Sequence, residues 1–161
     1  MTLTRLHQAL RKEGNATATE GVRKTYLALL AGVWQEGEQT VDLPMRKFRR
    51  SGEHRVEISA DGAAAISHFK LVQHYHGASL MQVRIDTGRT HQIRVHAAAT
   101  GHPVAGDKKY GDAVFNREMK RMGLQRLFLH ASHIELPIGE GLSVHAPLTD
   151  DLSKLLDKIA S

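Results

Sequence analysis

The stretch 78–102 constrains the fold most, because a strand pattern leads directly into a helix pattern within it. Residues 78–86 alternate in character, and successive side chains of a strand point to opposite sides of its sheet. One face is apolar and the other is mainly polar, the first formed by Met81, Val83 and Ile85 and the second by Leu80, Gln82 and Arg84. The alternation predicts a strand in a sheet with one buried face.

A helix is predicted immediately after this strand. Gly88 interrupts the backbone, and Thr90 is a suitable N-cap for a helix that begins at His91. The side that this helix would bury consists of Ile93, Val95, Ala97 and Ala98. The corner between strand and helix places Arg89 beside open backbone N–H groups, an arrangement that favours an anion or a carboxylate.

The remaining pattern predicts an α+β domain with a mixed, mostly antiparallel sheet and flanking helices. The clearest hairpin joins 64–75 to 78–86 through His76 and Gly77. Apolar spacing and turn residues indicate further strands at 22–30, 40–43, 45–50, 55–59, 127–136 and 142–145, and helices at 4–13, 114–122 and after Pro147. The Leu and Ala content of 22–30 also allows a helix there.

Composition limits the class of protein. A chain of 161 residues is long enough for one domain with a real core. It has no cysteine, no signal-peptide core and no apolar run of membrane-spanning length, so we expect a cytoplasmic protein without membrane contact. A net charge of +5 and a pI of 9.7 favour a polyanionic partner such as nucleic acid, although a merely basic soluble protein has the same values.

A dense group of cations lies on the predicted hairpin 45–59. It consists of Arg46, Lys47, Arg49, Arg50 and Arg55, with His54 among them. On a projecting hairpin these side chains would contact a phosphate backbone. The alternative is an edge strand that charge protects against aggregation. The density favours RNA or DNA binding slightly.

Arg89 and Arg94 are the strongest candidates for a site. Arg89 would pair with a carboxylate, and Arg94 would contact phosphate or support the site. The alternative places both on a solvated helix face. Tyr26, in the strand 22–30, would either pack in the core or stack on a base.

The 11 histidines raise the question of a metal site. His91 and His96 would lie about 140° apart around a helix, which is poor geometry for joint ligation. His74 and His76 have no obvious third ligand, and no HExxH motif is present. We therefore expect no metal.

No Walker motif, dinucleotide fingerprint or nucleophile elbow occurs. The chain does contain four sequence strings that are informative in combination, namely TGRTHQIRVH, GHPVAGDKKYG, RLFLHAS and KTYLALLAG. In this combination the chain resembles the bacterial ribosomal large subunit pseudouridine synthases of the RluA type, from about Leu6 to Lys158. Within the family, it most resembles the branch that modifies 23S ribosomal RNA.

The resemblance implies an isomerase that converts uridines of ribosomal RNA to pseudouridine and needs no cofactor. The target uridine is flipped from its stack. The motifs carry the family's roles over to individual residues: Arg89 pairs with the catalytic aspartate, Tyr26 stacks on the target base, and Lys24, Ile93 and Leu129 belong to the pocket.

The chain departs from the family pattern because it has no HRLD-type motif, which carries the catalytic aspartate. That motif would precede residue 1. Asp86, Asp107 and Asp112 do not stand in the right context. We therefore expect residues 1–161 to form part of a catalytic domain, without the aspartate segment or the S4-like RNA-binding domain, and to be inactive alone. The alternative is a non-catalytic RNA-binding remnant of the same fold.

The same expectation has a structural consequence. A catalytic domain without its aspartate segment would lack strands of its sheet, which exposes an edge and apolar surface. A second copy of the chain would cover such an edge, so we expect marginal stability or homo-oligomerisation.

Overall fold

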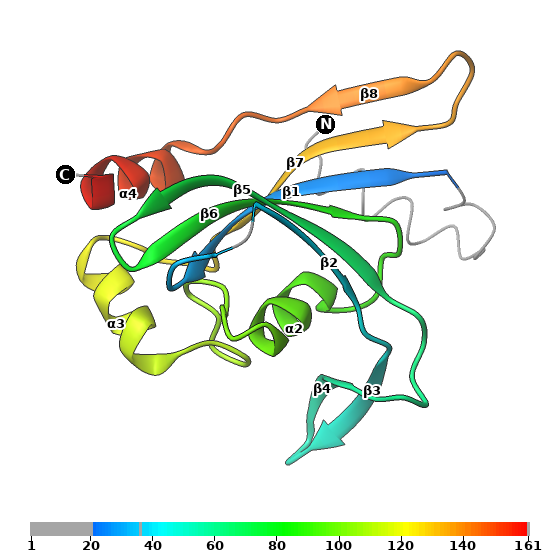
Figure 1. Ribbon diagram of the computed structural model, residues 1–161, viewed down its shortest axis with the longest axis horizontal. Coiled ribbons are helices and arrows are strands. Elements are labelled where there is room, and N and C mark those ends of the chain that lie inside the picture. The colour runs from blue at the N-terminus through cyan, green and yellow to red at the C-terminus, as the bar shows by residue number, and fades with distance from the viewer. Residues whose placement is uncertain (1–20, 36, 161) are drawn as a thin grey trace.

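A computed structural model describes residues 21–35 and 37–160. The helix predicted at 4–13 lies outside these residues. The described part forms one six-stranded sheet in the order β2-β5-β6-β1-β7-β8 and a separate hairpin of β3 and β4 (Figure 1). The strands are β1 (Arg23–Ala31), β2 (Glu38–Asp42), β3 (Met45–Arg50), β4 (Glu53–Ile58), β5 (Ile66–Tyr75), β6 (Ala78–Ile85), β7 (Leu129–Leu136) and β8 (Leu142–His145). The helices are α2 (Gln92–Ala99), α3 (Ala113–Arg121) and α4 (Asp150–Ala160).

The predicted α+β class is confirmed, and every ladder between the described strands is antiparallel. The predicted strands 22–30 and 142–145 correspond to β1 and β8, and the hairpin around Gly77 is the β5–β6 ladder. The sheet ends in two short strands, β2 and β8. Oligomerisation through an edge stays a prediction.

Helices cover the two faces of the sheet at different places. On one face α2 contributes Ile93 and Ala97 to a core that contains Leu30 and Val83. On the other face α3 and α4 enclose a second core, to which β1 contributes Leu29. Adjacent residues of β1 therefore enter different cores, as the period of a strand requires.

The alternation along β6 is confirmed, but the prediction of a single buried face was wrong at one end of the strand. Leu80 was placed on the polar face of its strand with Gln82 and Arg84, which are exposed. Leu80 is only 6% exposed, because α3 and α4 cover its end of that face. The alternation is thus confirmed for the face of Met81, Val83 and Ile85, which packs in the core with Ile93 of α2.

The predicted start of α2 was also wrong. The helix begins at Gln92, and His91 is at the N-cap with a left-handed φ of 56° and no side-chain cap bond. Thr90 therefore does not cap the helix. The local reason is a tight turn, in which the Gln92 N–H donates to the carbonyl oxygen of Arg89 at 3.1 Å.

The β3–β4 hairpin leaves the main sheet beside α2 (Figure 1). It turns at Ser51 and Gly52, both with positive φ, as the sequence predicted. Met45 and Val56 pack with Val95 of α2 in a small apolar cluster. At the base of the hairpin Gly62 has no room for a side chain, because a Cβ there would lie 2.4 Å from the Met45 backbone.

None of the helices in the described residues is long and apolar enough to span a membrane.

Candidate functional site

The loop between β6 and α2 is held by one buried amide, that of Gln92. Its Oε1 accepts hydrogen bonds from the Thr87 hydroxyl at 2.7 Å and from the Arg89 N–H at 3.2 Å. Its Nε2 donates to the carbonyl oxygen of Ile66 at 2.9 Å and to Ser67 Oγ at 3.0 Å. Because Gln92 is only 2% exposed, these bonds fix the loop backbone to β5.

Arg94 extends from α2 to Asp107, which lies in the turn after the helix. Two bonds of 2.8 Å join Arg94 Nε and Nη2 to the two carboxylate oxygens, and the Asp107 side chain is fully buried. The backbone N–H groups of Lys109 and Tyr110 donate to the same carboxylate. Arg94 was predicted to contact phosphate or to support the site, and this pair favours the supporting role.

The environment of Asp107 determines its charge. Burial alone would raise the pKa of its carboxyl, but the hydrogen bonds from Arg94 and from two backbone N–H groups outweigh burial and hold the pKa below its ordinary value. Arg94 has a raised pKa, for which its hydrogen bond to Asp107 is the largest cause. Both groups are therefore charged at neutral pH.

Unlike Arg94, Arg89 lies at the surface and has no carboxylate partner among the described residues. It is exposed, and its Nε donates to the carbonyl oxygen of Ala64 at 3.2 Å. Among residues 21–35 and 37–160, no carboxylate forms an ion pair with it. Arg89 lines an open pocket of about 450 Å³ together with Arg46 and Lys47 of the hairpin. Asp61 also lines this pocket.

The basic hairpin is partly neutralised by its own acids. Arg46 pairs with Glu57 at 2.6 Å, and Arg55 Nε lies 4.0 Å from Glu53. Arg49 contacts the His54 ring at 3.1 Å. The remaining predicted RNA-binding residues, Lys47, Arg49 and Arg50, are exposed and form no ion pair with a described carboxylate. The hairpin therefore presents cations to solvent beside the Arg89 pocket.

The other predicted site residues gather on the α2 face of the sheet. Tyr26 and Leu129 are half-buried against the core cluster that contains Ile93, which is 4% exposed. Lys24 is 8% exposed. Its side chain lies against the loop between β6 and α2, because a Cβ on Gly88 would be 3.3 Å from Lys24 Nζ. Strand β1, the Arg89 loop, α2 and β7 thus bring these residues to one region.

The histidines considered for a metal do not converge. His96 is fully buried, with its ring nitrogens at 2.8 Å from Ser67 Oγ and 2.9 Å from the Leu43 carbonyl oxygen. Burial is the largest influence on His96, and it lowers its pKa. His91 instead contacts the Tyr110 hydroxyl through Nδ1 at 2.9 Å. His96 is therefore a hydrogen-bonded core residue, and His91 connects the start of α2 to Tyr110.

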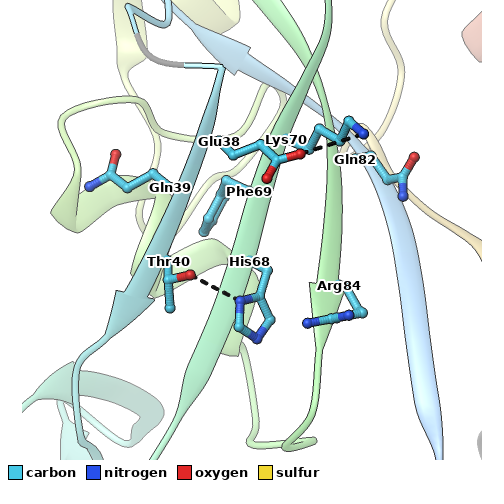
Figure 2. A pocket seen from close by; sticks show the side chains of 8 residues that line it. All are labelled: Glu38, Gln39, Thr40, His68, Phe69, Lys70, Gln82 and Arg84. Atoms are coloured by element: carbon cyan, nitrogen blue, oxygen red, sulfur yellow. Dashed lines mark hydrogen bonds and ion pairs between the residues drawn. The ribbon is translucent and has the colours of Figure 1, made fainter.

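The opposite, polar face of the sheet carries a second pocket, of about 210 Å³, which none of the predicted site residues lines. Figure 2 shows Thr40 bonded to His68 and Glu38 paired with Lys70 across β2 and β5. His68 also contacts Asp86 at 2.9 Å. Lys70 is paired with Glu38, and Arg84 is paired with Asp86, which lies outside the lining, so the basic side chains of this pocket already have acidic partners.

Sequence reasoning missed Gln92, Tyr110 and the pairing of Asp107. Gln92 and Tyr110 stood inside strings that were quoted for the resemblance, and no role was assigned to them. Their contacts join positions that are far apart in the chain, such as Val56 and Tyr110, which are 54 residues apart. A local pattern has no signal for such a contact.

Comparisons with known proteins identify the family of this chain. A family model described as RNA pseudouridylate synthase matches residues 1–99. Ribosomal large subunit pseudouridine synthase C of Escherichia coli O157:H7 is 39% identical over 98% of this chain and 49% of its own length. The protein of that name from Pasteurella multocida strain Pm70 is 41% identical over 96% of this chain and 46% of its own length. The chain spans about half the length of these curated relatives.

Solved structures show the same fold. Human RNA Pseudouridylate Synthase Domain Containing 1 has a TM-score of 0.69 at 29% identity, over 92% of this chain and 62% of its own. Human RNA Pseudouridylate Synthase Domain Containing 4 has a TM-score of 0.71 at 24% identity, over 98% of this chain and 68% of its own, and supports the fold alone. With the family match over residues 1–99, the chain belongs to the RNA pseudouridylate synthase family.

Proposed function

We propose that this chain supplies the uridine-binding region of an RNA pseudouridine synthase that acts on 23S ribosomal RNA. The observation that carries the proposal is the pocket in which Arg89 lies beside Arg46 and Lys47 of the basic hairpin. The reaction breaks the bond from ribose C1′ to uracil N1, turns the base, and joins C1′ to C5. The proton that leaves C5 is balanced by the one gained at N1, so the product is an isomer.

Binding in this proposal depends on two kinds of contact. Cations of the hairpin hold the phosphate backbone. Tyr26 stacks on the flipped uracil, and stacking on an aromatic ring contributes about 1–3 kcal/mol. That contribution is similar to the few kcal/mol that flipping costs. Ile93 and Leu129 belong to the core cluster against which Tyr26 packs, and we assign them with Lys24 to the side of the uracil rather than to the Arg89 pocket. Arg94 supports the site through its pair with Asp107.

Arg89 orients the catalytic aspartate in this scheme. Every aspartate of the chain lies in the described part, and Arg89 forms no ion pair with any of them. Asp61 shares its pocket without such contact. We therefore propose that the aspartate comes from an HRLD-bearing segment that docks beside Arg89. The same observation favours the alternative function, an RNA-binding module without catalysis.

A pseudouridine assay on unmodified 23S ribosomal RNA fragments tests both functions. We expect no product from the 161-residue chain alone and product after an HRLD-bearing segment of a relative is added. Arg89→Ala should abolish the restored activity, and Asp61→Asn should not affect it. Binding of the fragments without activity in either mixture would support the RNA-binding alternative.

Activity of the chain alone would contradict the proposed origin of the aspartate. If Asp61→Asn then removed that activity, Asp61 would be the nucleophile that Arg89 orients. Absence of RNA binding by the unaltered chain would contradict both proposed functions.

A further inference from the structure

We propose that Tyr110 is a positioning residue that holds the basic hairpin at a fixed place relative to α2 and Arg89. This inference rests on the proposed function, because the hairpin and Arg89 are assigned to the same RNA. It concerns a residue outside the hairpin, the Arg89 loop and α2, in the turn that follows the helix.

The Tyr110 hydroxyl joins two elements. Its oxygen accepts a hydrogen bond from the Val56 N–H of β4 at 3.0 Å, and it lies 2.9 Å from Nδ1 of His91 at the start of α2. The same ring meets the His91 ring edge-on, with centroids 5.6 Å apart. The Arg94 guanidinium lies 5.1 Å from the Tyr110 ring centroid. One side chain therefore contacts the hairpin and two residues of the helix region.

Tyr110 itself is held firmly. Its backbone N–H donates to Asp107 Oδ1 at 3.1 Å, and that carboxylate is the buried partner of Arg94. The neighbouring Lys109 extends to the hairpin as well, with its Nζ 3.0 Å from the carbonyl oxygen of His54. The turn that contains Asp107 is thus bonded to α2 through Arg94 and to β4 through Lys109 and Tyr110.

The hairpin lies outside the six-stranded sheet, and besides the Tyr110 bond it is attached to α2 through the small cluster of Met45, Val56 and Val95. An isolated two-stranded hairpin is at best marginally stable in water. At its base, the two backbone bonds between Met45 and Ala63 tie this hairpin to the chain that leads into β5. The Val56 N–H is a backbone donor of β4, and Tyr110 provides its acceptor.

The attachment affects how RNA would bind. Lys47 of β3 and Arg89 of the loop line one pocket, so the distance between a bound phosphate and the reacting base depends on the placement of the hairpin. A hairpin already in place avoids the ordering cost that a loose one incurs on binding. Loss of the Tyr110 hydroxyl should therefore weaken RNA binding without any lost contact between Tyr110 and RNA.

Tyr110→Phe removes the hydroxyl and keeps the ring over Arg94. The matched control is Tyr75→Phe, since Tyr75 packs against the core beneath α3 and α4 and away from the hairpin. We would measure hydrogen exchange of backbone amides and affinity for a 23S ribosomal RNA fragment. We expect exchange at Val56 to rise about tenfold in Tyr110→Phe, as one hydrogen bond is lost, with β5 and β6 unchanged. RNA affinity should fall about tenfold, in the range of ordinary coupling between sites.

A second background separates positioning from general destabilisation. In Lys47→Ala, which lacks a hairpin contact to phosphate, Tyr110→Phe should weaken RNA binding much less than in the unaltered chain. Equal losses in both backgrounds would overturn the inference, as would unchanged exchange at Val56 or faster exchange throughout β5 and β6. If the unaltered chain bound no RNA, the proposed function would fail, while hydrogen exchange at Val56 would still decide whether Tyr110 holds the hairpin.

Discussion

Arg89 and Arg94 belong to one short segment, yet the protein uses them in different ways. Arg94 is 17% exposed and makes two bonds of 2.8 Å to a buried carboxylate. Arg89 is exposed beside a pocket and donates from Nε to one carbonyl oxygen. A buried carboxylate needs a partner where it lies and holds the arginine that pairs with it, whereas a cation at a pocket remains available to a ligand. The comparison separates an arginine that is bonded within the fold from one that lines an open pocket.

The largest effect on stability should come from the buried pair. In Asp107→Asn, Arg94 keeps its charge but loses the carboxylate. Breaking a buried pair costs about 3–5 kcal/mol, and the 17% exposure of Arg94 makes this range an upper bound. Urea denaturation would measure the change in the free energy of unfolding. The matched control is Asp151→Asn, because its pair with Arg126 is about half exposed at 42% and 54%. That exposed pair should cost less than about 1 kcal/mol. Equal losses in both variants would contradict the comparison.

An intermediate effect is expected for Gln92→Ala. The change removes both ends of the amide and leaves the Arg89 N–H and the Ile66 carbonyl oxygen without this partner. A fully buried group that loses its partner costs about 1–3 kcal/mol, and these two groups are partly buried, so the loss should lie near the lower end of that range. The same denaturation experiment measures it, with Gln35→Ala as a control because Gln35 is an exposed glutamine. A loss no larger than that of Gln35→Ala would show that the loop does not depend on Gln92.

Acid should weaken the buried pair. The folded-state pKa of Asp107 lies below its ordinary value of 3.8, so its contribution to stability is complete above that value and is lost as pH falls through the lower folded pKa. Between about pH 5 and pH 2 the free energy of unfolding should therefore fall more steeply for the unaltered chain than for Asp107→Asn. Equal slopes would show that Asp107 is not stabilised as a carboxylate.

The smallest effect on stability is expected for Arg89→Ala. Its Nε bond to Ala64 lies at the surface, so its removal should change the free energy of unfolding by less than about 0.5 kcal/mol. Thermal and urea denaturation would measure this. A loss as large as that of Asp107→Asn would make Arg89 structural and would remove the difference between the two arginines.

Much of the fold could be predicted because strands and hairpins leave local patterns. Strand β8 was predicted at its observed bounds, and the turn at Ser51 and Gly52 was recognised from its residues. The start of α2 was not predicted correctly, because Thr90 fits the usual pattern of a cap. In the structure the Gln92 N–H donates to the Arg89 carbonyl oxygen in a tight turn, while His91 contacts Tyr110 and Gln92 bonds to β5, and these non-local contacts leave no local pattern.

The sequence by itself indicated most of the strands, with 22–30 left open between strand and helix, and it carried the strings of the family resemblance and the basic character of the hairpin. The tertiary structure alone decided that Arg94 is paired with Asp107 and that Tyr110 reaches Val56. The physical reason is that backbone periodicity is local and repeats every few residues. A buried charge or an open backbone donor is satisfied by whichever group the folded chain brings within bonding distance, however far away it lies in the sequence.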